Sequence, residues 1–171
     1  MTGRPVRSVV VIPLPEASVL TAPWRRPRAL DAHVTIAAPF LDPSEIDDHV
    51  VTALSACLAH LTSFDVVLQR VDWFDQRVVY VAPDDPAPFV RLARTLTETF
   101  LASTPGGGAT TYIPHLTIAK NRSLGELRTA AATSAALLPL HVRARAAVLF
   151  LFDVKSSAWR ERARVPLVPL A

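Results

Sequence analysis

The sequence His-Val-Thr-Ile-Ala at residues 33–37 returns at residues 115–119 as His-Leu-Thr-Ile-Ala, with one exchange of Val for Leu. Both segments are short runs of apolar and β-branched residues, which favour β-strands. In a strand, the side chains at positions i and i+2 point to the same face of the sheet. Each segment is therefore expected to present an imidazole and a hydroxyl on one face, while its aliphatic residues point into a core.

Two such strands would supply the groups for acid–base chemistry if they face each other across a groove. The imidazoles of His33 and His115 would transfer protons, and the hydroxyls of Thr35 and Thr117 would donate hydrogen bonds to an oxyanion. A single histidine on an apolar strand is more often a hydrogen-bonded structural residue. The recurrence of the threonine and of the flanking residues favours a functional pair, and gene duplication without retained function is the alternative.

The rest of the chain alternates between strand and helix patterns. Strands are expected at residues 7–14, 33–38, 64–71, 77–81, 115–119, 140–152 and 159–167. Helices are expected from Asp42 to Leu61, from Asp85 to Phe100, and from the capping box of Ser123 and Glu126 to Leu137. Gly106–Gly108 is interpreted as a loop. These patterns predict an α+β fold with mainly antiparallel strands and one domain over residues 1–171.

Composition excludes several classes of protein. The chain has 171 residues, of which 50% are hydrophobic, and its net charge of +3 predicts no dense basic patch for duplex DNA. The longest apolar run, residues 146–152, is far shorter than the roughly 18 residues of a membrane helix. The single cysteine, Cys57, allows no intramolecular disulfide and no Cys-rich zinc site. We expect a cytoplasmic monomer that binds neither duplex DNA nor a membrane.

The motifs and their flanks resemble a known family. Residues 31–36 followed by Pro39 and Phe40, and residues 112–120, resemble the two His-X-Ser/Thr motifs of the 2H phosphoesterase superfamily and its 2′-5′ RNA ligase-like proteins. Phe74 and residues 77–80 resemble the hairpin between these motifs. The resemblance implies a bilobal fold in which two mainly antiparallel β-sheets line a central cleft, with helices packed outside. It also implies that no metal or other cofactor is required.

Three residues beside the motifs are candidates for substrate binding. Lys120 follows the second motif where many relatives have Arg, and it would contact phosphate as a point charge without bidentate geometry. The alternative is a solvated strand end. Phe40 and Tyr112 could stack on a base, although aromatic residues beside strands are more often part of the core. Ala37 and Ala38 stand where many relatives carry bulkier or basic residues, so the first wall of the cleft is expected to be wider.

The expected activity is metal-independent opening of a nucleoside or RNA 2′,3′-cyclic phosphate by water, with the two histidines as acid and base. A 5′-hydroxyl in place of water would make the same site a 2′-5′ RNA ligase. A module that binds a nucleotide or an RNA end without turning it over is a second alternative. A metal-dependent hydrolase is a third, weaker one, because the remaining histidines show no metal-ligand spacing.

Overall fold

The eight strands of the described residues form a single curled sheet. The computed structural model describes residues 7–101 and 111–170, and the expected loop at Gly106–Gly108 lies outside these ranges. The strand order is β6-β3-β4-β5-β2-β1-β7-β8, and every neighbouring pair in it is antiparallel. The strands are β1 (Ser8–Pro13), β2 (His33–Ala37), β3 (Phe64–Phe74), β4 (Val78–Pro83), β5 (Leu116–Lys120), β6 (Leu140–Ala144), β7 (Ala146–Asp153) and β8 (Ala158–Pro166).

The predicted α+β class with antiparallel strands is confirmed, whereas the bilobal arrangement with two sheets is not. Strand pairing continues from one half of the sheet to the other through β2 and β5. That junction is narrow, because the register between β2 and β5 consists of one residue pair, Val34 and Leu116. The two predicted sheets are therefore the two halves of one sheet, and they meet at the two motif strands.

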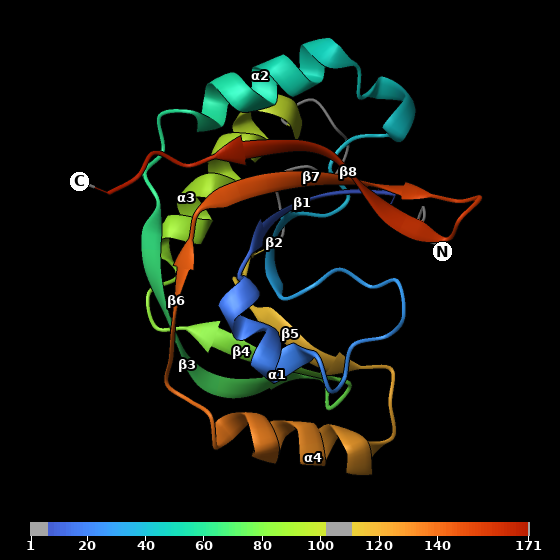
Figure 1. The fold of residues 1–171 in the computed structure, drawn as a ribbon, viewed down its shortest axis with the longest axis vertical. Helices are drawn as coiled ribbons and strands as arrows, with labels where there is room; N and C mark the ends of the chain where they lie inside the picture. Colours follow the sequence, from blue (N-terminus) through green and yellow to red (C-terminus); the bar gives the residue numbers. More distant parts are fainter. Residues whose placement is uncertain (1–6, 102–110, 171) are drawn as a thin grey trace.

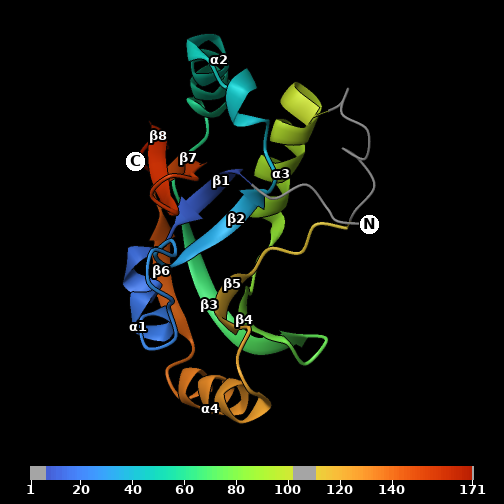
Figure 2. The ribbon, with the colours of Figure 1, turned by 90° about the vertical axis from the view of Figure 1, so that its right-hand side faces the viewer.

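Helices cover the two halves at opposite ends of the molecule, as Figures 1 and 2 show. Helix α4 packs against β3, β4 and β5, whereas α3 packs against β2 and α2 against β8. The α-helices are α1 (Ser18–Thr21), α2 (Asp48–Leu58), α3 (Ala87–Leu96) and α4 (Leu124–Ala135). Short 3-10 segments precede α1 and α2 at Pro15–Ala17 and Pro43–Glu45, and a π-helical turn, Thr97–Leu101, continues α3.

The helix predicted to begin at Asp42 is wrong at its start. Asp42 and Glu45 do form a capping box, but it caps the 3-10 segment, and α2 begins only at Asp48. Between the two, Ile46 is buried and leaves the helical region with a ψ of 81°. A second cap, the Asp47 carboxylate, then accepts a hydrogen bond from the amide of Val50 at 2.9 Å. The spacing of the apolar residues predicts a single helix here. Two successive N-caps instead divide the segment into a 3-10 turn and α2.

The motif strands alternate as predicted. Four aliphatic side chains of β2 and β5 are buried in the main hydrophobic core: Val34, Ile36, Leu116 and Ile118. The histidines and threonines between them are half-buried. The alternation of each strand therefore places the core on one face and the polar motif residues on the other.

Candidate active site

The histidines and threonines of both motifs line one cavity of about 1130 Å³, here called the motif cavity. Lys120, Tyr112 and Phe40, the predicted substrate-binding residues, line it as well. Ala37 and Ala38 also form part of its wall. The structure thus brings together all seven predicted site residues, although they come from distant parts of the sequence.

The strand register relates the two motifs to each other. Val34 of β2 is the antiparallel partner of Leu116 of β5. In an antiparallel pair, the residue before Val34 lies opposite the residue after Leu116. This register therefore places His33 opposite Thr117 and Thr35 opposite His115. Each histidine is therefore matched with the threonine of the other motif, on the face opposite to the core.

A backbone irregularity also repeats in both motifs. In the pairing of β1 with β2, Ile36 is an extra residue between the partners of Val10 and Val11. In the pairing of β4 with β5, Ile118 is the extra residue between the partners of Val79 and Tyr80. A bulge of this kind bends a strand and re-aims nearby side chains. The two motifs thus share a distortion next to the threonine as well as a sequence.

Both imidazoles are held by the same kind of hydrogen bond. Nδ1 of His33 lies 2.6 Å from the carbonyl oxygen of Asp31, and Nδ1 of His115 lies 2.7 Å from that of Ile113. Because a carbonyl oxygen only accepts, Nδ1 of each ring must donate, which leaves Nε2 to exchange protons. The sequence carries no signal for these contacts, since any residue supplies a backbone carbonyl.

The electrostatics of the motif cavity favour an anion. Burial lowers the pKa of His33 and of His115, and the positive charge of Lys120 lowers the pKa of both further. His115 itself also lowers the pKa of His33 when it is charged. These effects mean that the two rings and the ammonium group are close enough to repel one another when protonated. An anion among them would relieve that repulsion.

Phe40 and Tyr112 have close contacts within the protein. The Tyr112 hydroxyl donates a hydrogen bond of 2.9 Å to the carbonyl oxygen of Thr35, and burial raises the pKa of this phenol. Phe40 is only 3% exposed and meets the edge of Phe100 at 5.1 Å between ring centroids. Both rings therefore form the wall of the motif cavity, and their stacking on a base stays a prediction.

Phe74 is in direct contact with His115, which the sequence did not indicate. Its ring meets the ring of His115 edge-on at 4.9 Å and stacks on Tyr80 at 4.1 Å. Phe74 also lines the motif cavity. The β3–β4 hairpin was predicted, but its contact with His115 depends on the pairing of β4 with β5, which local sequence patterns do not reveal.

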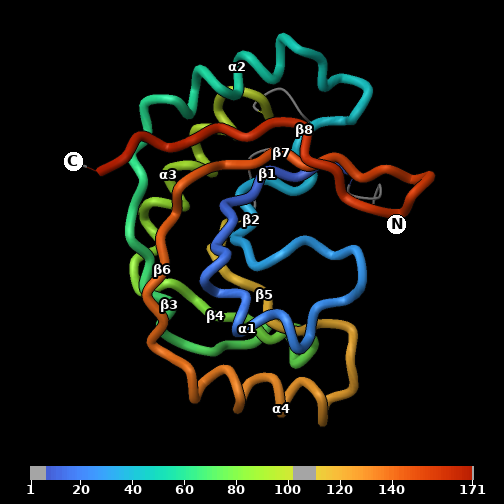
Figure 3. The backbone as a smooth tube through the Cα atoms, in the orientation of Figure 1, coloured from blue at the N-terminus to red at the C-terminus, as the bar shows by residue number. Residues whose placement is uncertain are grey.

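The sequence did not predict one part of the wall of the motif cavity. The segment between α1 and β2 loops out beside β5 before it enters β2 (Figure 3), and it contributes Trp24, Arg25 and Arg26 to the motif cavity. Its prolines predicted an irregular connection, and nothing local indicated where it would lie. Arg122, near this segment, donates to the carbonyl oxygen of Trp24 at 3.2 Å and forms an ion pair with Glu126.

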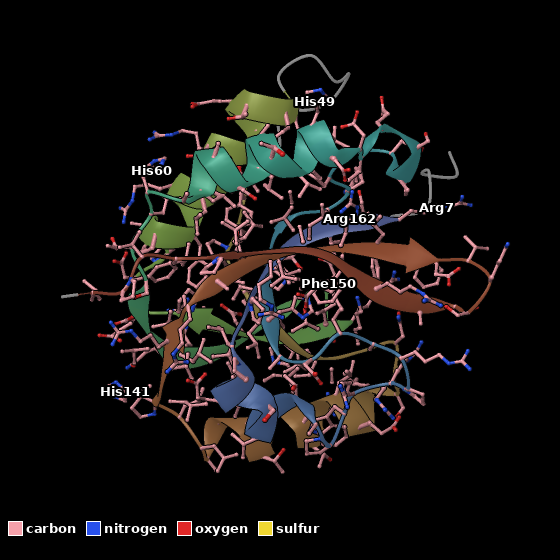
Figure 4. The ribbon with its side chains drawn as sticks, turned by 45° about the horizontal axis from the view of Figure 1, so that its top comes forward. Arg7, His49, His60, His141, Phe150 and Arg162 are labelled. Atoms are coloured by element: carbon pink, nitrogen blue, oxygen red, sulfur yellow. The ribbon has the colours of Figure 1, made fainter. Side chains whose placement is uncertain are left out.

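The remaining histidines lie apart from the motif cavity. His49 and His60 lie by α2 and His141 is on β6, all exposed (Figure 4). Within residues 7–101 and 111–170, no group of three or more His, Cys, Asp or Glu residues is placed to hold a metal ion. In the same ranges, no helix has the length and hydropathy needed to cross a membrane.

Comparisons with known proteins agree with this geometry. The family model of the 2′-5′ RNA ligase superfamily matches residues 22–155, which include both motifs. Among solved structures, apo LigT of E. coli is 20% identical with a TM-score of 0.62, covering 97% of this chain and 99% of its own. TT0787 of Thermus thermophilus is 18% identical with a TM-score of 0.63, covering 96% and 100%. No curated protein sequence matches the chain.

Proposed function

This chain belongs to the 2′-5′ RNA ligase superfamily, and on that basis we propose that it is a metal-independent phosphodiesterase that opens nucleoside or RNA 2′,3′-cyclic phosphates. The observation that carries the proposal is the matched pair of motifs in one cavity. His33 and His115 each have Nδ1 held by a carbonyl oxygen, and the register matches each ring with the threonine of the other motif.

The chemistry needs one neutral and one protonated imidazole. Nε2 of the neutral ring takes a proton from water as the water oxygen bonds to phosphorus. The bond from phosphorus to one ribose oxygen breaks, and Nε2 of the protonated ring gives that oxygen its proton. The product is a nucleoside 2′- or 3′-phosphate, and the two rings have exchanged protonation states. Because both rings are held alike, the ribose oxygen that faces each ring decides which one acts as acid.

The other motif residues would bind the phosphate. The hydroxyls of Thr35 and Thr117 would donate hydrogen bonds to its two non-bridging oxygens, whose negative charge increases in the transition state. Lys120 lines the same cavity and its positive charge lowers the pKa of both histidines, so this charge would balance that of the phosphate. Lys120 binds here without the bidentate geometry that an arginine would provide.

Structures of relatives support a nucleotide substrate. E. coli LigT has been solved in complex with 3′-AMP and with phosphate, at TM-scores of 0.61 for both. 3′-AMP carries its phosphate on one of the two ribose oxygens that ring opening would leave phosphorylated. The name of the superfamily also favours ligation as a second activity of the same site. In that case a 5′-hydroxyl would attack in place of water, and the same proton transfers would form a 2′-5′ bond.

A direct test is to incubate the purified protein with adenosine 2′,3′-cyclic phosphate in the presence of EDTA and to follow the products by ³¹P NMR. Conversion to a single 2′- or 3′-phosphate that continues in EDTA is the expected result. A non-catalytic binding module would be stabilised by the ligand without forming product. Loss of all turnover in EDTA would contradict the proposal. RNA with a 5′-hydroxyl end, added in a parallel reaction, would reveal ligation as a longer product.

A further inference from the structure

Arg26 is fixed at the rim of the motif cavity by a contact distant in sequence. Its Nη2 donates a hydrogen bond of 2.8 Å to the carbonyl oxygen of Asn121, the residue that follows Lys120 at the end of β5. The side chain is exposed and lines the motif cavity. A guanidinium group has five N–H donors, so most of them remain for a ligand. The Arg26 charge is thus held beside the end of the strand that carries the second motif.

The charges around the motif cavity exceed what one phosphate requires. Among residues 7–101 and 111–170, three cationic side chains other than histidine line its wall, those of Arg25, Arg26 and Lys120. Arg25 is neutralised by an ion pair with Asp31. A cyclic phosphodiester carries one negative charge, which Lys120 suffices to balance, and the protonated imidazole adds further positive charge.

The charge of Arg26 is unpaired in the part of the chain that the structure describes. No carboxylate of the described residues forms an ion pair with it. Residues 1–6, 102–110 and 171 contain no Asp or Glu side chain that could supply one. An exposed arginine without a partner is common on a protein surface, but this one borders a cavity that is proposed to hold a phosphate.

The volume of the motif cavity also allows a substrate larger than one nucleotide. Pockets for small molecules have volumes of about 300–1,000 Å³, whereas this cavity measures about 1130 Å³. A cavity of this volume has room for the end of an oligonucleotide as well as for a single nucleoside cyclic phosphate.

We infer that Arg26 selects RNA ends over mononucleotides at this site, because it binds the phosphodiester on the 5′ side of the terminal nucleotide. This inference rests on the proposed function and narrows its substrate class. Arg26 is then a specificity-determining residue, because a bidentate contact to a second phosphate is available to an oligonucleotide and not to a mononucleotide. The terminal cyclic phosphate would remain at the histidines.

The test compares three substrates that share the terminal cyclic phosphate, two of which differ only in the charge of the second phosphate. These are adenosine 2′,3′-cyclic phosphate, the adenosine dinucleotide ending in the same cyclic phosphate, and that dinucleotide with an uncharged methylphosphonate linkage. The wild-type protein should show a kcat/KM for the charged dinucleotide about tenfold above that for the uncharged one, the ratio expected for one charge-assisted contact. Arg26→Gln should remove this preference, and Arg26→Lys should restore part of it.

Arg28→Gln is the matched control. Arg28 lies on the same segment and also donates to a backbone carbonyl, that of Ser156 at 3.1 Å, but it does not line the motif cavity. The Arg28→Gln protein should keep the preference for the charged dinucleotide. Equal rates for the charged and uncharged dinucleotides in the wild-type protein would overturn the inference, and so would an equal loss of preference in both variants.

A binding measurement separates this inference from the proposed function. The same two dinucleotides ending in a 3′-phosphate have no ring to open, so their affinities are measured without turnover. Tighter binding of the charged one by the wild-type protein, lost in Arg26→Gln, would support the role of Arg26 even if no cyclic phosphate were opened. Turnover of the mononucleotide without any effect of Arg26 on either readout would leave the proposed function standing and refute the inference.

Discussion

Val34 and Leu116, the central residues of the two motifs, are antiparallel partners, and theirs is the pair in register where the two halves of the sheet meet. Both side chains are fully buried in the main core. Their neighbours on either side, the histidines and threonines, face the motif cavity. One junction therefore anchors the sheet on its core face and positions the candidate active site on the other.

Leu116→Ala is expected to lower the free energy of unfolding by about 2–5 kcal/mol, because it removes a fully buried side chain and leaves a cavity. Leu124→Ala is the control, since Leu124 is 41% exposed at the start of α4, and its change should stay within about 0.5 kcal/mol. Chemical denaturation followed by circular dichroism measures both. Similar losses in the two variants would show that the junction is not a centre of packing.

His33→Ala and His115→Ala should each reduce kcat for cyclic phosphate opening by about 10²–10⁴-fold, the range for general acid–base catalysis. Because acid and base act in one transition state, the double variant should lose little more than either single variant. His60→Ala, which changes an exposed histidine outside the motif cavity, should retain the wild-type rate. Wild-type turnover in either motif variant would rule out the two-histidine scheme.

The threonines are tested by replacing each with valine, which has nearly the same shape but lacks the hydroxyl. Thr35→Val and Thr117→Val should each reduce kcat by about 10²-fold or more, as expected for the loss of one oxyanion donor. Thr35→Ser and Thr117→Ser retain the hydroxyl and should keep most of the activity. If the valine and serine variants were equally impaired, packing would be the cause, and the hydroxyls would have no part in catalysis.

The pH dependence follows from the lowered pKa of both histidines. The rate needs one ring neutral and the other protonated, so kcat/KM should be bell-shaped. Because the pKa of each ring lies below its usual 6.5, the optimum of kcat/KM should lie on the acid side of that value. A bound phosphate anion favours the charged rings, so kcat should peak at a higher pH than kcat/KM. A single rising limb that EDTA abolishes would indicate a metal-bound hydroxide instead.

Lys120→Met should move the kcat/KM optimum to higher pH. The positive charge of Lys120 lowers the pKa of both histidines, and its removal should therefore raise the pKa of both. KM should also rise, because a phosphate ligand is lost. Lys120→Arg keeps the charge, and its optimum should stay near that of the wild type. An unshifted profile in Lys120→Met would place the ammonium group too far from the rings to act on the phosphate.

The sequence by itself determined the features that depend on neighbouring residues. The alternation in residues 33–37 and 115–119 predicted which side chains are buried and which face the motif cavity, because a strand has a period of two. The capping box of Ser123 and Glu126 predicted the start of α4 for a similar reason, since a cap involves residues three positions apart. The two motifs also indicated the family that the family model confirms.

Only the tertiary structure decided how these pieces meet. One pairing of residues distant in sequence joins the expected two sheets into one, and no local pattern specifies such a partner. The carbonyl groups that hold His33 and His115 are backbone atoms, which any residue could supply. Arg26 is held at the motif cavity by a hydrogen bond to Asn121, which lies 95 positions further along the chain. Long-range contacts of this kind depend on the path of the whole chain, which a local pattern in the sequence does not encode.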